Sequence, residues 1–229
     1  LFAQWGLSST RVALGNFIKR RAEWRAYARS TLKIVVEGDA DDALIAAALH
    51  HWRREWDVDL DCDPILEWSR NASIETSIRA VIYGIESTPK MTEAALKWLP
   101  SLEAAWMSVI PAEKFAAMRK EFLTLKDDPR VNQSRWATKA GAQEHFQIIG
   151  ESLKGVAAAI VDQQIFIYNR DVLMAGTALL AAYETLKAEQ RMVDFADLEW
   201  RAFSLLSNSE HADTTQYRLD ARYRHILLD

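Results

Sequence analysis

The chain has 229 residues, of which 49% are hydrophobic and 26% are charged, a composition that excludes disorder as its main state. Its formal net charge of −4 argues against polyanion binding by the chain as a whole, so any nucleic-acid contact must come from a local basic patch. The only cysteine, Cys62, excludes an internal disulfide framework and fits a reducing, cytoplasmic environment. No uninterrupted apolar run approaches the ~20 residues of a membrane span.

The first 85 residues predict three helices, in a chain with only eight glycines and five prolines. The first is expected from Thr10 to Arg29. The second is expected from Ala40 to Trp56, where an acidic start suits the positive end of a helix dipole. The third follows the turn in "DCDPILEWSR" and is expected to run to Ile85, with Pro64 in its first turn. This half of the chain therefore indicates an all-α fold.

The middle of the chain predicts shorter elements and then a long helix. Residues 87–125 predict three short helices broken by Pro100 and Pro111, and residues 126–141, "KDDPRVNQSRWATKAG", predict a polar loop. From Gln143 to about Gln190 apolar residues recur at gaps of mostly three or four. A helix over that stretch would be roughly 70 Å long, which is typical of a connection between two bodies.

The C-terminal segment predicts an amphipathic helix in "VDFADLEWRAFSLLS", a short helix in "TTQYRLDARY" and a strand in "HILLD". A single strand cannot form a sheet, so its partners are expected outside this chain. We therefore expect one piece of a larger protein. Its fold class is all-α, a multi-helix subdomain with one long helix that ends in a single short strand of a missing sheet. In the absence of that sheet, "HILLD" is expected to be irregular, to lie along the preceding helix, or to pair with a second copy of the chain.

Two patterns that invite a metal-site interpretation are better explained by helix structure. His50 and His51 are adjacent, so on a helix they point about 100° apart and do not share a face. The aspartates of "GDADD", residues 38–42, suit a helix N-terminus. The glycines never cluster, so neither kind of glycine-rich phosphate loop is predicted.

A basic stripe is the first candidate binding site. Arg21, Arg25 and Arg29 fall at i, i+4 and i+8, with Trp24 and Tyr27 beside them. Such a stripe can hold a phosphate backbone, and an exposed tryptophan can stack on a base. The alternative is a solvated helix face whose arginines pair with acids on a neighbouring helix, and the sequence leaves both interpretations open.

The tail carries a more specific pattern. Asp194, Phe195, Asp197 and Leu198 of "DFADL" open a helix that ends in Leu205-Leu206, and the "HILLD" of "ARYRHILLD" begins about twenty residues after that end. The pair resembles the stretch that precedes and enters the Walker B strand of the UvrD/Rep-type superfamily of DNA helicases. The segment "LKAEQRMVDFADLEWRAFSLLS" is similar to sequences of the AddA/RecB-like branch, the helicase–nuclease subunits that process double-strand breaks. "IKRRAEW" and "EFLTLKDDPR" resemble stretches of that branch's accessory 1B subdomain.

The resemblance implies a division of the chain and a set of roles. Residues 1–190 would form a helical 1B-like accessory subdomain, and residues 191–229 a fragment of the RecA-like core 1A. Asp229 would be the Walker B aspartate, a Mg²⁺ ligand beside ATP in the parent protein. The phosphate loop and the catalytic glutamate would lie outside, so no catalytic residue and no ATPase activity are expected within this chain, and no ATP or Mg²⁺ is expected to bind to it.

The implied partners are DNA and protein. The DNA would be a duplex/single-strand junction held without sequence specificity, and the protein a partner subunit of a helicase–nuclease complex in double-strand break repair and recombination. The parent's exonuclease domain would follow further along. The alternative is a self-standing helical protein-interaction module without nucleotide chemistry, which explains the composition equally well but leaves "DFADL" and "RYRHILLD" as a coincidence.

Overall fold

The computed structural model describes residues 2–32, 41–207 and 217–218, and over these residues the fold is all-α, which confirms the predicted fold class. The described part of the chain contains no strand, only an isolated antiparallel bridge between Leu123 and Pro129. The predicted "HILLD" strand and Asp229 lie outside the described residues, as does nearly all of the short helix expected before them.

The chain divides into two compact units, and the division falls within helix α10 (Gln143–Gln190), whose bounds are those predicted. The terminal unit comprises residues 1–56 and 166–229, and the central unit comprises residues 57–165. The boundary expected between residues 190 and 191 does not coincide with this division. Helix α11 (Phe195–Ser207) belongs to the terminal unit because it packs against α3 (Arg21–Ser30).

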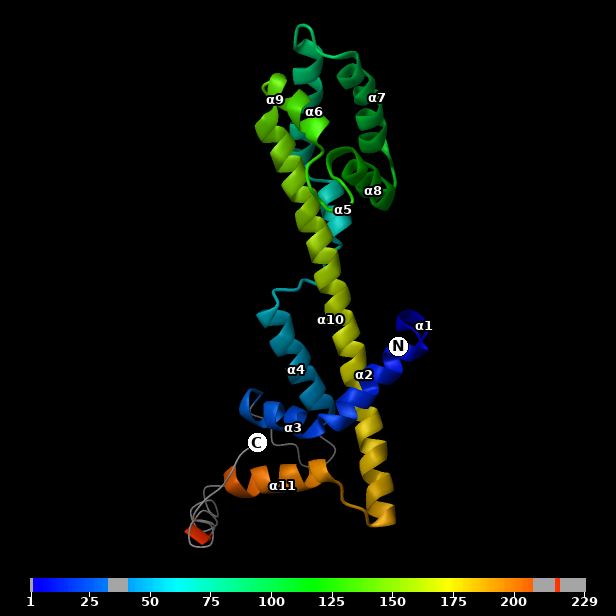
Figure 1. Cartoon of the computed structure of the whole chain (residues 1–229), viewed down its shortest axis with the longest axis vertical. Helices are drawn as coiled ribbons and strands as arrows, with labels where there is room; N and C mark the ends of the chain where they lie inside the picture. Colours follow the sequence, from blue (N-terminus) through cyan, green and yellow to red (C-terminus); the bar gives the residue numbers. More distant parts are fainter. Residues whose placement is uncertain (1, 33–40, 208–216, 219–229) are drawn as a thin grey trace. The chain divides into compact units, whose positions relative to one another are not determined.

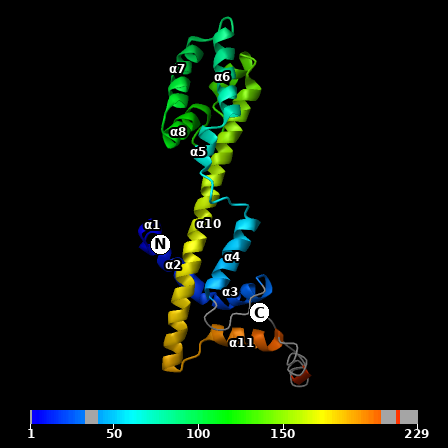
Figure 2. The same ribbon diagram turned by 180° about the vertical axis from the view of Figure 1, so that it is seen from behind.

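The terminal unit also contains α1 (Phe2–Trp5), α2 (Leu7–Lys19), α4 (Asp41–Glu55) and the second part of α10. Figures 1 and 2 both show α11 beside α3. Phe17 of α2 packs on Gly176 of α10, where an added Cβ would lie 2.7 Å from the phenyl ring. The glycine is therefore what allows this close approach of α2 to α10.

Two helices that the sequence predicts as continuous are interrupted. The helix expected over Thr10–Arg29 breaks at Arg20, whose φ of −100° and ψ of 21° end α2 before α3 begins. The helix expected to reach Ile85 is divided into α5 (Pro64–Ser69) and α6 (Ala72–Ser87). Between them the side chain of Asn71 accepts hydrogen bonds from two backbone N–H groups at the start of α6, so it favours a new helix start over continuation.

The central unit packs α5 to α9 and the first part of α10 around an aromatic core. Its other helices are α7 (Glu93–Met107), α8 (Pro111–Phe122) and α9 (Val131–Lys139). Large rings meet edge to face or at a tilt, with Phe122 against both Trp98 and Phe146. The buried aromatic members of this core are Trp68, Trp98, Trp106, Phe115, Phe122 and Phe146.

Two predictions for the central unit are wrong for reasons of tertiary packing. Helix α7 runs through Pro100 without a break. Its neighbours Trp98, Leu99 and Leu102 are buried in the core, and this packing holds the helix where a proline alone would end it. Residues 126–141 are not one loop, because α9 forms within them and buries Ala137 completely.

Helix α10 also bears on the membrane question. It contains a stretch long and apolar enough, by length and composition, to cross a membrane, and 22% of that stretch is buried within the protein. The expectation concerned uninterrupted apolar runs, and this stretch meets the criterion because the criterion allows a few polar residues within it. A core helix of a water-soluble protein meets it too, so one such helix is weak support for membrane insertion.

Candidate functional site

The "DFADL" motif forms the N-terminus of α11. The carboxylate of Asp194 accepts a hydrogen bond from the backbone N–H of Asp197 at 3.2 Å, and the carboxylate of Asp197 accepts one from the N–H of Asp194 at 3.1 Å. This is the reciprocal geometry of a capping box, with aspartate in place of the usual glutamate. Local backbone hydrogen bonds therefore help to fix both motif acids.

Both acids then enter an ionic cluster, defined here as Arg21, Tyr183, Lys187, Asp194 and Asp197. The Lys187 ammonium donates to both carboxylate oxygens of Asp197 at 2.7 Å. Arg21 donates to Asp194 and, at 3.3 Å, to Asp197, while the Tyr183 hydroxyl donates to Asp194 at 2.8 Å. Arg21, Lys187 and Asp197 are buried. The cluster thereby joins α3, α10 and α11.

The opposite charges of this cluster stabilise one another's ionised forms. Burial alone would raise the pKa of Asp197, but hydrogen bonds from Lys187, from the Asp194 backbone and from Arg21 outweigh it and lower the pKa to about 2. Burial would lower the pKa of Lys187, yet its hydrogen bonds to Asp197 and Glu184 leave that pKa raised. Arg21, Lys187, Asp194 and Asp197 therefore stay charged at neutral pH, while Tyr183, whose pKa is raised, stays neutral. This arrangement suits a structural joint and not a proton-transfer site.

The predicted arginine stripe does not form one exposed face. Arg21 is 3% exposed and belongs to the ionic cluster. Arg25 pairs with Glu184 of α10 at 3.0 Å, and the side chain of Arg29 lies outside what the structure describes. Arg21 and Arg25 therefore pair with acids of neighbouring elements, as the alternative interpretation of the stripe predicted. Arg21 differs from that interpretation in being buried and not solvated. The sequence could not show this, because the acids lie more than 150 residues further along.

The apolar residues of the "DFADL" motif point away from the ionic cluster and into solvent. Phe195 is 85% exposed and Leu198 is 55% exposed, and Leu205 continues the same helical spacing at nearly half exposure. We call Phe195, Leu198 and Leu205 the apolar face of α11. Within residues 2–32, 41–207 and 217–218 these side chains stay open, although α11 is anchored on its acidic side.

A groove lined by aromatic side chains lies on the terminal unit. It encloses about 460 Å³ between α2, α3, α4 and α10. Ring centroids are 5.9 Å apart for Phe17 and Trp24 and 5.8 Å apart for Trp24 and Tyr27. We call this the aromatic groove, and its aromatic lining residues are Phe17, Trp24, Tyr27 and Trp52. The sequence placed Trp24 and Tyr27 beside basic residues, but Phe17 and Trp52 join them only in the tertiary structure.

Exposed cations lie on the helix that forms one wall of this groove. Arg11 and Lys19 of α2 and the adjoining Arg20 are all exposed, and Arg20 lines the groove itself. Arg20 also pairs with Glu23 at 3.1 Å, but both side chains are largely in solvent, where such pairs are weak. Among the described side chains of α2, α3 and the residue between them, the exposed positive charge is thus on Arg11, Lys19 and Arg20 and not on Arg21 or Arg25 of α3.

No metal centre is visible among the described residues, where no group of three or more His, Cys, Asp or Glu side chains converges. The predicted Mg²⁺ ligand, Asp229, lies outside those residues.

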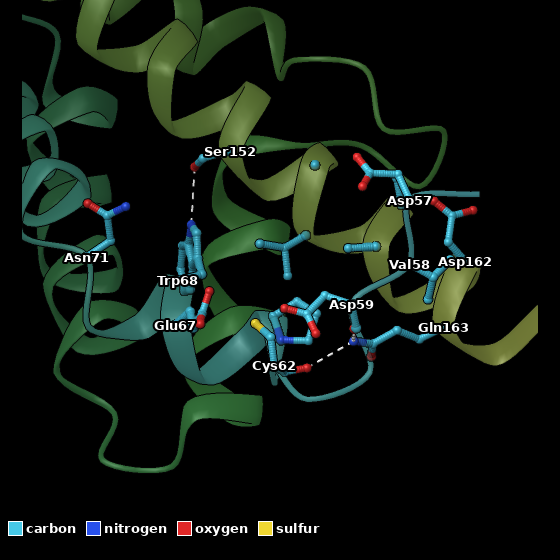
Figure 3. Close-up of a pocket in the computed structure, with 15 residues that line it drawn as sticks. Asp57, Val58, Asp59, Cys62, Glu67, Trp68, Asn71, Ser152, Asp162 and Gln163 are labelled. Atoms are coloured by element: carbon cyan, nitrogen blue, oxygen red, sulfur yellow. Dashed lines mark hydrogen bonds between the residues drawn. The ribbon is translucent and has the colours of Figure 1, made fainter. Parts of the chain in front are cut away.

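The central unit has its own pocket, of about 710 Å³, formed by residues 57–71 and by α10 (Figure 3). Cys62 lies in its wall. A hydrogen bond to Glu67, together with burial and nearby carboxylates, raises the pKa of the Cys62 thiol to about 11. At pH 8 such a thiol is almost entirely protonated, so it is a poor nucleophile.

We therefore predict that Glu67→Gln increases the rate of Cys62 alkylation. Removal of the carboxylate should lower the thiol pKa and speed reaction with N-ethylmaleimide at pH 8 by about 10- to 100-fold. Because Cys62 is the only cysteine, the modified protein can be counted directly by mass spectrometry. Glu93→Gln, which changes an exposed acid of α7, is the control and should leave the rate unchanged. Equal rates for Glu67→Gln and the unmodified chain would contradict the stated cause of the shift.

Comparison with known proteins adds no relative: no protein-family model, no curated protein and no solved structure matches the chain. The class of protein that the fold defines is therefore an all-α chain of two compact units.

Proposed function

We propose that the chain is the DNA-contacting accessory region of an ATP-dependent DNA helicase, similar to the AddA/RecB-like helicase–nuclease subunits, that acts in double-strand break repair and recombination. The parent protein would work in the cytoplasm with a partner subunit. The residues around α11 would connect this accessory region to the motor core of the parent protein. The basic, aromatic surface of the terminal unit would contact DNA.

Helix α11 provides the main support. Its acidic side is anchored to the terminal unit by the ionic cluster, while its apolar face, with Phe195 at 85% exposure, stays open among the described residues. Exposed apolar patches of this kind typically mark a contact with another body. A helix held firmly on one side and apolar on the other is what a joint between an accessory region and a larger core requires.

The aromatic groove supports the DNA-contacting part of the proposal. Single-stranded nucleic acid is bound without sequence preference where bases stack on aromatic rings and cations follow the backbone. Trp24 and Tyr27 supply rings, and Arg20 supplies a cation at the same groove. Arg11 and Lys19 extend the positive charge along α2. This assigns the DNA contact to α2 and the groove in place of Arg21 and Arg25.

The ATP chemistry of the parent would lie outside the described residues. ATP would be held with Mg²⁺, and the Asp229 carboxylate would be one ligand of that metal. The residues described here would have a mechanical role, in which they hold DNA and transmit force through α11.

We predict salt-dependent binding of a duplex with a single-stranded tail, measured by fluorescence anisotropy. The triple variant Arg11→Ala, Lys19→Ala, Arg20→Ala should bind more weakly. The slope of log K against log salt should fall by about 2, because each single-strand phosphate contact contributes roughly 0.7. Trp24→Ala should weaken binding by about 5- to 100-fold with little change in slope, since stacking is not ionic. Trp24→Phe should retain most of the affinity.

The matched control removes three exposed cations from the central unit, Arg79, Lys97 and Lys126, each to alanine. It should leave both affinity and slope close to those of the unmodified chain. If the α2 triple variant and the control variant weaken DNA binding equally, the effect would be one of overall charge and not of this surface. Absence of any DNA binding would favour the rival class, a helical protein-interaction module without nucleotide chemistry.

A further inference from the structure

The pocket of the central unit has an apolar floor and an acidic rim. Val58 and Trp68 are buried beneath it, with Pro64 and Val156 beside them. The carboxylates among its lining residues belong to Asp57, Asp59, Glu67 and Asp162, and no lysine or arginine lines it. Figure 3 shows Asp57 and Asp162 together on one side of the pocket, with Glu67 and Trp68 across from them.

The pocket walls are held in place by direct hydrogen bonds. The Gln163 amide of α10 donates to the backbone carbonyl of Cys62 at 2.9 Å and also to that of Asp59, which secures the loop before α5. The Trp68 indole N–H donates to the Ser152 hydroxyl at 3.1 Å, which ties α5 to α10. The pocket is therefore formed in advance of any ligand, as ligand sites usually are.

The α10 side of the pocket is built from small residues. Gly155, Ala158 and Ala159 line it, and a Cβ added at Gly155 would meet nothing within 4 Å. Glycine within a helix is less favourable than alanine. An alanine at residue 155 would therefore fit without a clash and favour the helix, and a longer side chain there would occupy pocket volume.

We propose that this pocket binds an arginine or lysine side chain presented by a segment of a partner protein. Such a side chain combines an apolar stem, which matches the floor, with a cationic head, which matches the rim carboxylates of Asp57, Glu67 and Asp162. DNA is a poor occupant, because its phosphates would face those carboxylates and like charges repel. The volume of about 710 Å³ exceeds that of one such side chain, so apolar neighbours in the same partner segment would fill the remainder.

The test titrates the full chain with an acetylated, amidated peptide of alternating leucine and arginine and follows NMR signals. Binding should shift the Trp68 indole N–H and the Gly155 amide in a saturable way. Asp57→Asn, Glu67→Gln and Asp162→Asn together should weaken binding by about tenfold, since each exposed ion pair changes a binding constant by roughly two- to fivefold. Asparagine suits residue 57, whose φ of 50° it tolerates. Gly155→Leu should abolish binding, and Gly155→Ala should preserve it.

Several outcomes would overturn the proposal. A peptide with glutamate in place of arginine that binds equally well would remove the charge argument. Shifts that miss Trp68 and Gly155 would place the peptide elsewhere. Butylguanidinium that binds as tightly as the peptide would make this a small-molecule site and not a docking site. The inference is independent of DNA contact: Gly155→Leu should leave DNA binding unchanged, so either proposal can fail alone.

Discussion

Replacement of Asp197 by asparagine should lower the free energy of unfolding of the terminal unit more than replacement of any exposed residue does. The change leaves the buried Lys187 without the carboxylate that accepts both of its 2.7 Å hydrogen bonds, and it removes one acceptor from Arg21. Loss of one partner from a buried ion pair typically costs about 3–5 kcal/mol, because the remaining charge stays desolvated. Glu184, 3.0 Å from Lys187, should keep the cost near the lower end of that range. We expect that decrease in the free energy of unfolding, measured by urea denaturation followed by circular dichroism.

Controls separate the buried charge from charge in general. Glu93→Gln breaks an exposed ion pair with Lys97 and should cost about 1 kcal/mol or less. The double variant Lys187→Met, Asp197→Leu removes both partners and should recover much of the stability lost in Asp197→Asn. A cost for Asp197→Asn no greater than that of Glu93→Gln would show that the ionic cluster does not hold α11 in place.

The pH dependence of stability gives a second measure of the same cluster. The folded pKa of Asp197 is lowered to about 2, so its contribution is complete above the ordinary carboxyl value and is lost as pH falls through the folded value. About 2 kcal/mol of stability should therefore disappear between roughly pH 4 and pH 2. Asp197→Asn should lose less over that range, because the titrating group is gone.

Phe122→Ala should have the largest effect on the central unit. Phe122 is fully buried at the end of α8, with ring centroids 4.9 Å from Phe146 and 5.9 Å from Trp98. Removal of a buried phenyl ring costs about 3–5 kcal/mol through lost burial and the cavity left behind. The measurement is the free energy of unfolding from urea titration.

The matched control for this variant lies three residues away. Leu125→Ala truncates a fully exposed apolar side chain and should change stability by no more than about 0.5 kcal/mol. A cost below about 1.5 kcal/mol for Phe122→Ala would mean that the core around α8 is not closely packed.

The sequence by itself determined the fold class and the elements with strong periodicity or clear end signals. Helix α10 begins at Gln143 and ends at Gln190 as predicted, because its apolar spacing persists over the whole stretch. Helix α11 follows Asp194 because an acid at that position caps the first turn. Each of these signals is local, since both the apolar spacing and the cap act within a few residues of chain.

Only the tertiary structure decided the features that depend on distant contacts. Pro100 stays within α7 and α9 forms in a polar stretch because each is held by buried neighbours such as Leu102 and Ala137. The arginine stripe was a reasonable surface prediction, yet Arg21 is buried against acids 173 and 176 residues away. A helical pattern shows which residues share a face, but the partner across that face decides whether the face is buried or exposed. For Arg21 that partner is α11, and in the aromatic groove Trp52 of α4 joins rings of α2 and α3 in the same way.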